Sequence, residues 1–295
     1  MSLARTGELV AAARDAGWGV GAFNVITIEH AEGVVEGAQL AGAPAILQIS
    51  QNAVTYHRGK VEPLAAACAL IAAAAAVPIA LHLDHVNDRD LLHRAADAGF
   101  SSVMYDASSL AYADNVAATR SAAVWAHEHG LWLEAELGEV GGKDGVHSPV
   151  ARTKPDEAAV YATATSVDAL AVAVGSSHAM TAKSARLDIP LIRELRAAVP
   201  VPLVLHGSSG VLDEELRQGV AAGLTKINIG TQLNVAFTRA VREALTDAAV
   251  TDPRRYLRPA ADSVTRTVAD IITSLRPQAV AYAPVTASNL CRTSS

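Results

Sequence analysis

The amino-acid sequence predicts an α/β protein built as a (β/α)8 TIM barrel. Eight short apolar segments recur at intervals of roughly 20 to 40 residues, which is the length of a strand–helix unit. Helical periodicity fills the intervals, as in 28–38, which follows Thr27, and in 91–96, which follows Asp88; both are N-cap residue types. A doubly wound open sheet is the alternative arrangement. The expected strands are 20–23, 45–49, 79–83, 102–105, 131–135, 169–174, 203–205 and 226–227.

The chain shows no compositional boundary, and residues 1–295 are expected to form one barrel domain. A final helix at about 261–275 and the tail to residue 295 exceed eight repeats and suggest packing between subunits. Residues 64–77 form an Ala-rich run that is too short to span a bilayer. Membrane association is therefore not expected.

Composition and charge narrow the classes of partner. The chain is 51% hydrophobic with a formal net charge of −6, and it has no basic run, so nucleic acid is not an expected partner. The amino terminus lacks the apolar stretch of a signal peptide. Its two cysteines, Cys68 and Cys291, form no disulfide framework. These features predict reduced thiols and a cytoplasmic location.

Polar residues stand at the carboxyl ends of all eight expected strands. They are Asn24, Ser50, Asp84, His85, Asp106, Glu136, His178, His206 and Asn228. In a (β/α)8 barrel these ends meet at one mouth, where active sites lie. Three of the residues are histidines from different strands, and three nitrogen ligands with one open position are typical of catalytic Zn²⁺. The alternative is that the three histidines are separate hydrogen-bonded residues with no shared metal. The position of His82 inside its strand favours a structural role for that histidine.

Two glycine-containing turns follow the seventh and eighth strands. One is His206-Gly207-Ser208-Ser209-Gly210, and the other is Asn228-Ile229-Gly230-Thr231 at the start of a helix. Backbone N–H groups at such a helix start suit a phosphate, and these loops are the usual barrel phosphate site. A third glycine-rich segment, 138–149, is either a lid over the mouth or a surface turn.

A series of motifs runs from about residue 19 to residue 257. They are Gly21-Ala22-Phe23-Asn24, Ile46-Leu47-Gln48-Ile49-Ser50, Leu81-His82-Leu83-Asp84-His85, Val103-Met104-Tyr105-Asp106, Glu134-Ala135-Glu136-Leu137-Gly138 with Gly141-Gly142, His178, Leu205-His206-Gly207-Ser208-Ser209-Gly210, Lys226-Ile227-Asn228 and Asp252-Pro253-Arg254-Arg255-Tyr256. On these motifs the chain resembles the class II, metal-dependent ketose-bisphosphate aldolases, which include fructose- and tagatose-bisphosphate aldolases.

The resemblance implies a role for each matching position. Zn²⁺ would be held by His85, His178 and His206, with Asp84 as the acid/base. Asp106 and Glu136 match acidic positions that hold a second cation, divalent or monovalent. Asn24 and Ser50 would meet the aldehyde half of the substrate. The phosphate site would be formed by Ala179, Gly207, Ser208, Ser209, Asn228, Ile229, Gly230 and Thr231. A homodimer or homotetramer is also implied.

Three positions depart from the family pattern. Ala179 stands where the family often has Gly, and Val86 where it often has His or Cys. The family's lid carries a catalytic Glu near the Gly-Gly pair, whereas the nearest acid here is Asp144, whose side chain is shorter. Proton transfer is assigned to Asp144 only because it is the acid nearest to the Gly-Gly pair.

The implied reaction is the reversible cleavage of a ketose 1,6-bisphosphate, with fructose 1,6-bisphosphate favoured, to dihydroxyacetone phosphate and glyceraldehyde 3-phosphate, as in glycolysis. Tagatose bisphosphate or another acceptor aldehyde is an alternative for the same chemistry. A Schiff-base aldolase using Lys226 is a second alternative, although it leaves the three histidines without a role. A non-catalytic barrel used for binding is the third.

Overall fold

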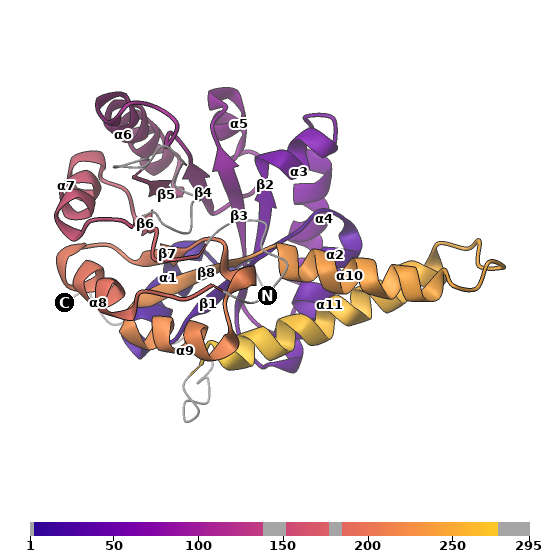
Figure 1. Ribbon diagram of the computed structural model, residues 1–295. Coiled ribbons are helices and arrows are strands. Elements are labelled where there is room, and N and C mark those ends of the chain that lie inside the picture. Colours follow the sequence, from indigo (N-terminus) through magenta and orange to yellow (C-terminus); the bar gives the residue numbers. More distant parts are fainter. Residues whose placement is uncertain (1–2, 138–151, 177–184, 277–295) are drawn as a thin grey trace, which may run out of the picture.

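The computed structural model describes residues 3–137, 152–176 and 185–276. Eight parallel strands pair in sequence order, and the last pairs with the first, which closes the barrel (Figure 1). The predicted barrel is confirmed, and the open-sheet alternative is wrong. The strands are β1 (Val20–Asn24), β2 (Ala45–Ser50), β3 (Ile79–Val86), β4 (Ser102–Tyr105), β5 (Trp132–Glu136), β6 (Ala169–Ala171), β7 (Leu203–Leu205) and β8 (Leu224–Ile229).

Helices surround the barrel (Figure 1). They are α1 (Thr6–Ala16), α2 (Ile28–Leu40), α3 (Gln51–Tyr56), α4 (Glu62–Ala73), α5 (Arg89–Arg94), α6 (Tyr112–Glu128), α7 (Pro155–Thr165), α8 (Ile189–Ala198), α9 (Asp213–Ala222), α10 (Thr231–Ala244) and α11 (Arg254–Ser274), with a 3-10 turn at Ser208–Gly210. Asp88 caps α5 by accepting a hydrogen bond from the backbone N–H of Asp90. Thr27 precedes α2 as expected, but its hydroxyl contacts His30 instead.

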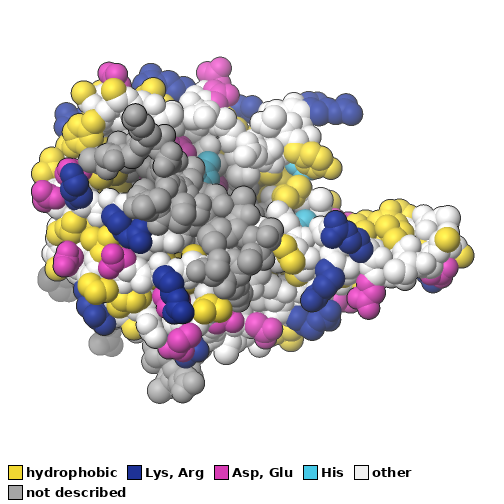
Figure 2. All heavy atoms as spheres, in the orientation of Figure 1, with side chains coloured by type: hydrophobic (Ala, Val, Ile, Leu, Met, Phe, Trp, Pro, Cys, Tyr) yellow, Lys and Arg dark blue, Asp and Glu magenta, His cyan; other side chains and the backbone are white. Residues whose placement is uncertain are grey.

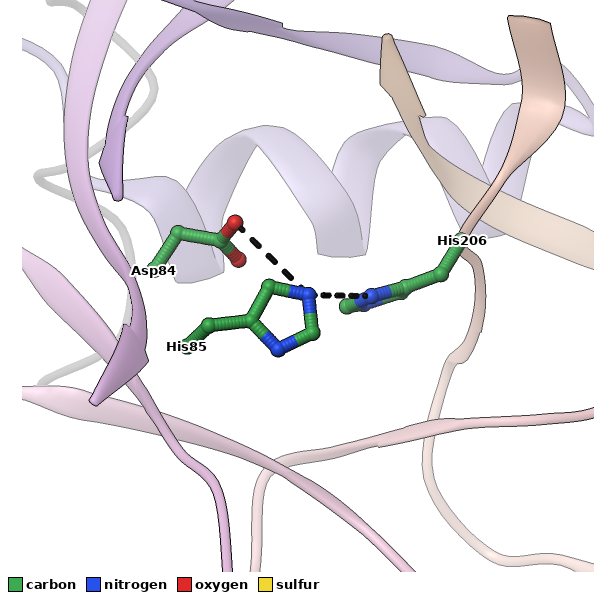
Figure 3. Close-up of side chains that lie close together, drawn as sticks. All are labelled: Asp84, His85 and His206. Carbon is green, nitrogen blue, oxygen red and sulfur yellow. Dashed lines mark hydrogen bonds and ion pairs between the residues drawn. The ribbon is translucent and has the colours of Figure 1, made fainter. Parts of the chain in front are cut away.

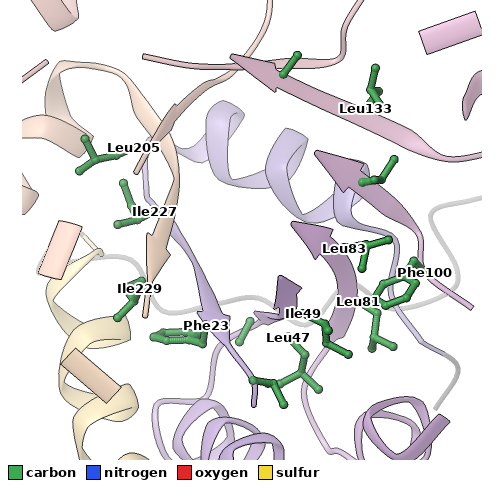
Figure 4. Packing of buried hydrophobic residues seen from close by; sticks show 14 of the residues in the cluster. Phe23, Leu47, Ile49, Leu81, Leu83, Phe100, Leu133, Leu205, Ile227 and Ile229 are labelled. Carbon is green, nitrogen blue, oxygen red and sulfur yellow. The ribbon is translucent and has the colours of Figure 1, made fainter. Parts of the chain in front are cut away.

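The outward face of the strands is apolar throughout. Alternate residues such as Leu81 and Leu83 on β3 are buried against the helices, together with Phe23 of β1, Leu47 of β2 and Ile227 of β8 (Figure 4). Each buried aliphatic side chain removed from water stabilises the fold by about 1.5–3 kcal/mol. This period-2 alternation fixes which residues of each strand point into the barrel.

The inward face begins apolar at the amino-terminal end of the barrel. There α1, which the sequence did not predict, packs Leu9 and Val10 against Val20 of β1, Ile46 of β2 and Ala80 of β3. These residues close the end of the barrel opposite the polar strand ends. Any opening to solvent from the barrel interior therefore lies at the carboxyl-terminal end.

Helix α11 begins seven residues before the predicted start at 261 and lies against α2 and α10. Gly33 and Gly37 of α2 allow the close approach. A Cβ at Gly33 would lie only 2.9 Å from a backbone oxygen of α11, and a Cβ at Gly37 only 2.6 Å from another. Together α10 and α11 project beyond the barrel as an antiparallel arm (Figure 1). Within the described part of the chain, no helix has the length and apolarity needed to cross a membrane.

Candidate active site

A bulge at the end of β3 brings two adjacent residues into the mouth. Between Leu83 and Val86, β3 advances three residues while β4 advances two, from Val103 to Tyr105. The extra residue is His85, whose φ of +50° lies in the left-handed region. Such a backbone costs about 1–3 kcal/mol for a non-glycine residue and is typical of functional sites. In a strand without a bulge, the side chains of the adjacent residues Asp84 and His85 would point to opposite faces. The bulge instead lets both side chains point toward the mouth.

The imidazole rings of His85 and His206 lie side by side in the mouth, with one nitrogen of each pointing toward the other ring (Figure 3). His85 Nε2 lies 3.1 Å from His206 Nδ1, and the rings are nearly perpendicular. Two nitrogen ligands at about 2.0–2.1 Å from a tetrahedral metal ion lie roughly 3.3 Å apart. The spacing of these two atoms therefore fits ligands of one ion.

The far nitrogen of each ring is held by a carboxylate. His85 Nδ1 lies 2.9 Å from Asp106 Oδ2, and His206 Nε2 lies 2.8 Å from Glu134 Oε1. A carboxylate that accepts the N–H of one ring nitrogen leaves the lone pair of the other nitrogen for a metal. The contacts to Asp106 and Glu134 thus leave the two inner nitrogens, His85 Nε2 and His206 Nδ1, to share either a proton or a metal ion.

The charges at the mouth also favour a cation. Although burial opposes it, the carboxylates of Asp84 and Asp106 raise the pKa of His85 to about 10. The pKa of Asp84 lies well below its ordinary value, because His85 and a contact from His82 outweigh the effect of its burial. Asp84 is therefore an ionised carboxylate, with Oδ2 3.9 Å from His85 Nε2. The donor set fits a divalent metal with a base beside it.

A second group of metal-ligating atoms joins His85, Asp106 and Glu136. Among the described residues Glu136 Oε2 has no hydrogen-bond partner, and burial together with the nearby Asp106 raises the pKa of Glu136 to about 7. Asp106 is already engaged, since Oδ1 accepts hydrogen bonds from the backbone N–H and hydroxyl of Ser108. Glu136 is thus the residue of this group whose carboxylate a second cation would stabilise most.

The mouth is a cavity of about 470 Å³. Its lining includes ten of the predicted residues: Asn24, Ser50, Asp84, His85, Asp106, Gly207, Ser209, Asn228, Gly230 and Thr231, the first residue of α10. The described lining contains no Lys or Arg. In Figure 2, Lys and Arg side chains lie at several places around the edge of the face that is drawn, some of them beside Asp or Glu.

The two predicted phosphate turns lie at the rim of this cavity. Gly207 has a φ of +67°, which glycine adopts without strain, and Gly230 immediately precedes α10. Two side chains point elsewhere: the Ser208 hydroxyl donates to the Asn228 carbonyl oxygen, and Ile229 is buried in the outer layer. Those two residues can meet a phosphate only through their backbone.

Some predicted site residues lie outside the described residues. These are His178, Ala179 and Asp144, together with the glycine-rich segment 138–149. Glu136 and His206 are brought to the mouth but do not belong to the cavity lining itself. The proposed third histidine ligand and the proposed lid acid therefore stay predictions.

The sequence did not reveal a buried polar layer beneath the mouth. Gln48, His82, Glu134 and Lys226 point into the barrel one step below the predicted residues, each at most 1% exposed. Lys226 lies 2.8 Å from Glu134 and does not line the cavity. Its burial and pairing disfavour the Schiff-base alternative. The alternation in Glu134-Ala135-Glu136 was the available signal, because it places both glutamates on the inward face.

Comparison with known proteins decides the family. Residues 4–278 match the family described as fructose-bisphosphate aldolase class-II. The chain belongs to this family. It is 35% identical over 277 residues to the fructose-bisphosphate aldolase of Staphylococcus aureus, covering 91% of this chain and 95% of that one. The fructose-bisphosphate aldolase of Staphylococcus epidermidis matches to the same extent.

Solved structures of other aldolases share the fold. The YdjI aldolase of Escherichia coli superposes with a TM-score of 0.82 at 30% identity, over 92% of this chain and 97% of that one. The fructose-bisphosphate aldolase of Campylobacter jejuni, at 23% identity and a TM-score of 0.80, covers 93% and 95% and supports the fold alone. As a class II aldolase, this chain is a lyase of a generally metal-dependent family with small phosphorylated sugars as substrates.

Proposed function

We propose that this protein is a Zn²⁺-dependent aldolase that reversibly cleaves fructose 1,6-bisphosphate to dihydroxyacetone phosphate and glyceraldehyde 3-phosphate. The observation that carries the proposal is the pair of facing nitrogen atoms on His85 and His206, 3.1 Å apart, with the ionised Asp84 beside them. His178 is the proposed third ligand. A metal ion bound there supplies a Lewis acid that stabilises the negative charge formed on the C2 and C3 oxygens.

The chain's own residues supply the proton transfer. Asp84 is held at the cavity wall by Gln48, whose Nε2 donates to Asp84 Oδ2 at 3.1 Å. From there its carboxylate takes the proton of the C4 hydroxyl as the C3–C4 bond breaks. Asp144 is the proposed acid for C3. Glu136 and Asp106 are the proposed ligands of a second cation.

The phosphate of the dihydroxyacetone half is assigned to the rim formed by Gly207, Ser209 and Gly230. A 14-residue helix, α10, begins directly after Gly230, and its amino-terminal N–H groups and dipole favour an anion. Asn24 and Ser50, on the opposite wall, are left for the aldehyde half. Phosphate binding remote from the reacting carbons orients the substrate.

The second phosphate lacks a cationic partner among the described lining residues, which supports a contribution from another subunit. Arg254 and Arg258 lie on the projecting α11, with side chains 90% and 80% exposed. We therefore propose a homodimer or homotetramer in which one of the basic residues Arg254, Arg255 or Arg258 enters a partner's mouth. Light scattering at micromolar concentration should give at least twice the 30.5 kDa chain mass; a monomer contradicts this proposal. The cytoplasmic location stays a prediction.

A cleavage assay on zinc-loaded protein tests the function. Fructose 1,6-bisphosphate and its C4 epimer tagatose 1,6-bisphosphate are compared by the rate of dihydroxyacetone phosphate release. We expect the larger kcat/KM for fructose 1,6-bisphosphate. A preference for the tagatose compound overturns the substrate, and cleavage of neither with proton exchange at C3 of dihydroxyacetone phosphate intact indicates another acceptor aldehyde. Full zinc occupancy with neither reaction favours the non-catalytic barrel.

A further inference from the structure

One charged residue inside the barrel has no part in the reaction as described so far. Lys226, on β8, is fully buried, and its ammonium group meets three oxygen atoms from three strands. Nζ lies 2.8 Å from Glu134 Oε2, 2.7 Å from Asn228 Oδ1 and 3.2 Å from Gln48 Oε1. The contacts to Asn228 and Gln48 are hydrogen bonds and the contact to Glu134 is an ion pair, so the ammonium group, which can only donate, meets an oxygen on each of three sides.

Each of these three oxygens belongs to a side chain that also contacts the mouth. The other carboxylate oxygen of Glu134 accepts the hydrogen bond from His206 Nε2. Because Lys226 can only donate, it also fixes which end of each amide faces it. The amide nitrogen of Asn228 is thereby placed 3.2 Å from His206 Nε2, where it is a second donor beside the Nε2–H that Glu134 accepts and makes no hydrogen bond with it.

The Gln48 branch leads to the proposed base. With Gln48 Oε1 bound to Lys226, its Nε2 donates to Asp84 Oδ2 at 3.1 Å and to Asn24 Oδ1 at 2.7 Å. If Gln48 were turned over, a carbonyl oxygen would face the ionised Asp84. The ammonium group thus determines the donor that Asp84 receives.

We propose that Lys226 is a positioning residue, whose ammonium group holds the His206 ring through Glu134 and directs the Asp84 carboxylate through Gln48. The first branch keeps the proton of His206 on Nε2 and its Nδ1 lone pair toward the metal position. The second branch keeps Asp84 aimed into the cavity. This inference rests on the proposed function, in which His206 is a metal ligand and Asp84 is the base.

The metal branch is tested with the double substitution Lys226→Met/Glu134→Gln. It removes both buried charges together, whereas Lys226→Met alone would leave Glu134 charged and unpaired in the interior. We expect the Zn²⁺ dissociation constant, measured by competition with a chromogenic chelator, to rise roughly 10–100-fold. The matched control is Leu195→Ala on α8, buried away from the mouth, which should lower stability and leave the Zn²⁺ affinity unchanged.

The base branch is tested with Gln48→Leu, which removes the donor to Asp84 and keeps the volume. We expect Zn²⁺ affinity close to that of the unaltered protein and a kcat lower by roughly an order of magnitude. The two variants should therefore separate metal affinity from kcat. Equal Zn²⁺ affinity in the double variant and the unaltered protein, or equal losses of affinity and kcat in Gln48→Leu, contradicts the proposal.

A spectroscopic measurement tests the first branch of the proposal without any substitution of Lys226. In zinc-loaded protein labelled with ¹⁵N-histidine, His206 should carry a protected proton on Nε2; its signal is assigned by its loss in His206→Gln. A proton on Nδ1 overturns the proposal. Failure of the unaltered protein to bind Zn²⁺ would overturn the proposed function, which is a separate outcome from unchanged affinity in the double variant.

Discussion

The two faces of the same eight strands differ sharply in chemistry. On β3, Leu81 and Leu83 point outward into an apolar layer, whereas His82 and Asp84 point inward. The inward face changes along the barrel axis, from apolar residues packed against α1 to buried ionised groups and then to the polar mouth. The outward face shows no such gradient.

This difference separates what stabilises the protein from what acts on a substrate. Burial of the outward face contributes favourable free energy at every strand. Burial of Glu134, Lys226 and Asp84 costs desolvation free energy that their mutual contacts only offset. Burial alone would raise the pKa of Glu134, yet the charge of Lys226 and the hydrogen bond from His206 lower this pKa to about 2. The inward charges are thus retained at a cost, as expected of a site.

The largest effect is expected from His206→Ala. The substitution removes one of the two facing nitrogens and leaves at most two histidine ligands, too few for catalytic zinc. Elemental analysis should find far less than one Zn²⁺ per chain, and cleavage should fall to the assay background. If the variant kept one Zn²⁺ per chain and full activity, the His206 ring would not be a metal ligand.

Asp84→Asn should give the next largest effect. The amide has nearly the same shape but cannot accept a proton, so kcat should fall roughly 10²–10⁴-fold. Zinc content should stay at the level of the unaltered protein, because Asp84 is proposed as base and not as ligand. Loss of zinc in parallel with kcat would move Asp84 into the ligand set.

The adjacent outward residue gives the matched contrast. Leu83→Ala removes a fully buried side chain from the outer layer, so the free energy of unfolding should fall by about 2–5 kcal/mol. Urea denaturation measures this fall, and kcat/KM at low temperature should stay within about twofold. A loss of kcat/KM comparable to that of Asp84→Asn would break the distinction between the two faces.

The smallest effect concerns His30 on α2, which is stacked on Phe237 of α10 outside the barrel. Burial lowers the pKa of His30 to about 4, against about 6.5 when unfolded. Folding therefore favours the neutral ring. Its contribution to stability is complete above pH 6.5 and is lost as the pH falls toward 4. Between pH 7.5 and pH 5 the loss should be about 2 kcal/mol.

The variant His30→Phe isolates this contribution, because it keeps a ring against Phe237 and cannot titrate. Urea denaturation of both proteins, with chelator present to remove any effect of metal, gives the difference in unfolding free energy at each pH. That difference should shift by about 2 kcal/mol in favour of the variant at pH 5. A constant difference would show that His30 is not buried as a neutral ring.

The sequence revealed the barrel because the apolar segments and their spacing are local properties. It also revealed most of the mouth, since each strand end carries its polar residue directly after an apolar run. It could not reveal the bulge, because alternation alone places only one of Asp84 and His85 inward. Nor could it pair Glu134 with Lys226, whose contact depends on strands that meet only in the closed barrel.

The central claim is that the inward groups at the mouth hold a divalent metal on which cleavage depends. The most direct measurement removes metal with a chelator and then titrates Zn²⁺ back while the rate of fructose 1,6-bisphosphate cleavage is recorded. The account predicts negligible activity after removal and a rate that rises until about one Zn²⁺ is bound per chain. Undiminished cleavage by protein shown by elemental analysis to contain no divalent metal would contradict it.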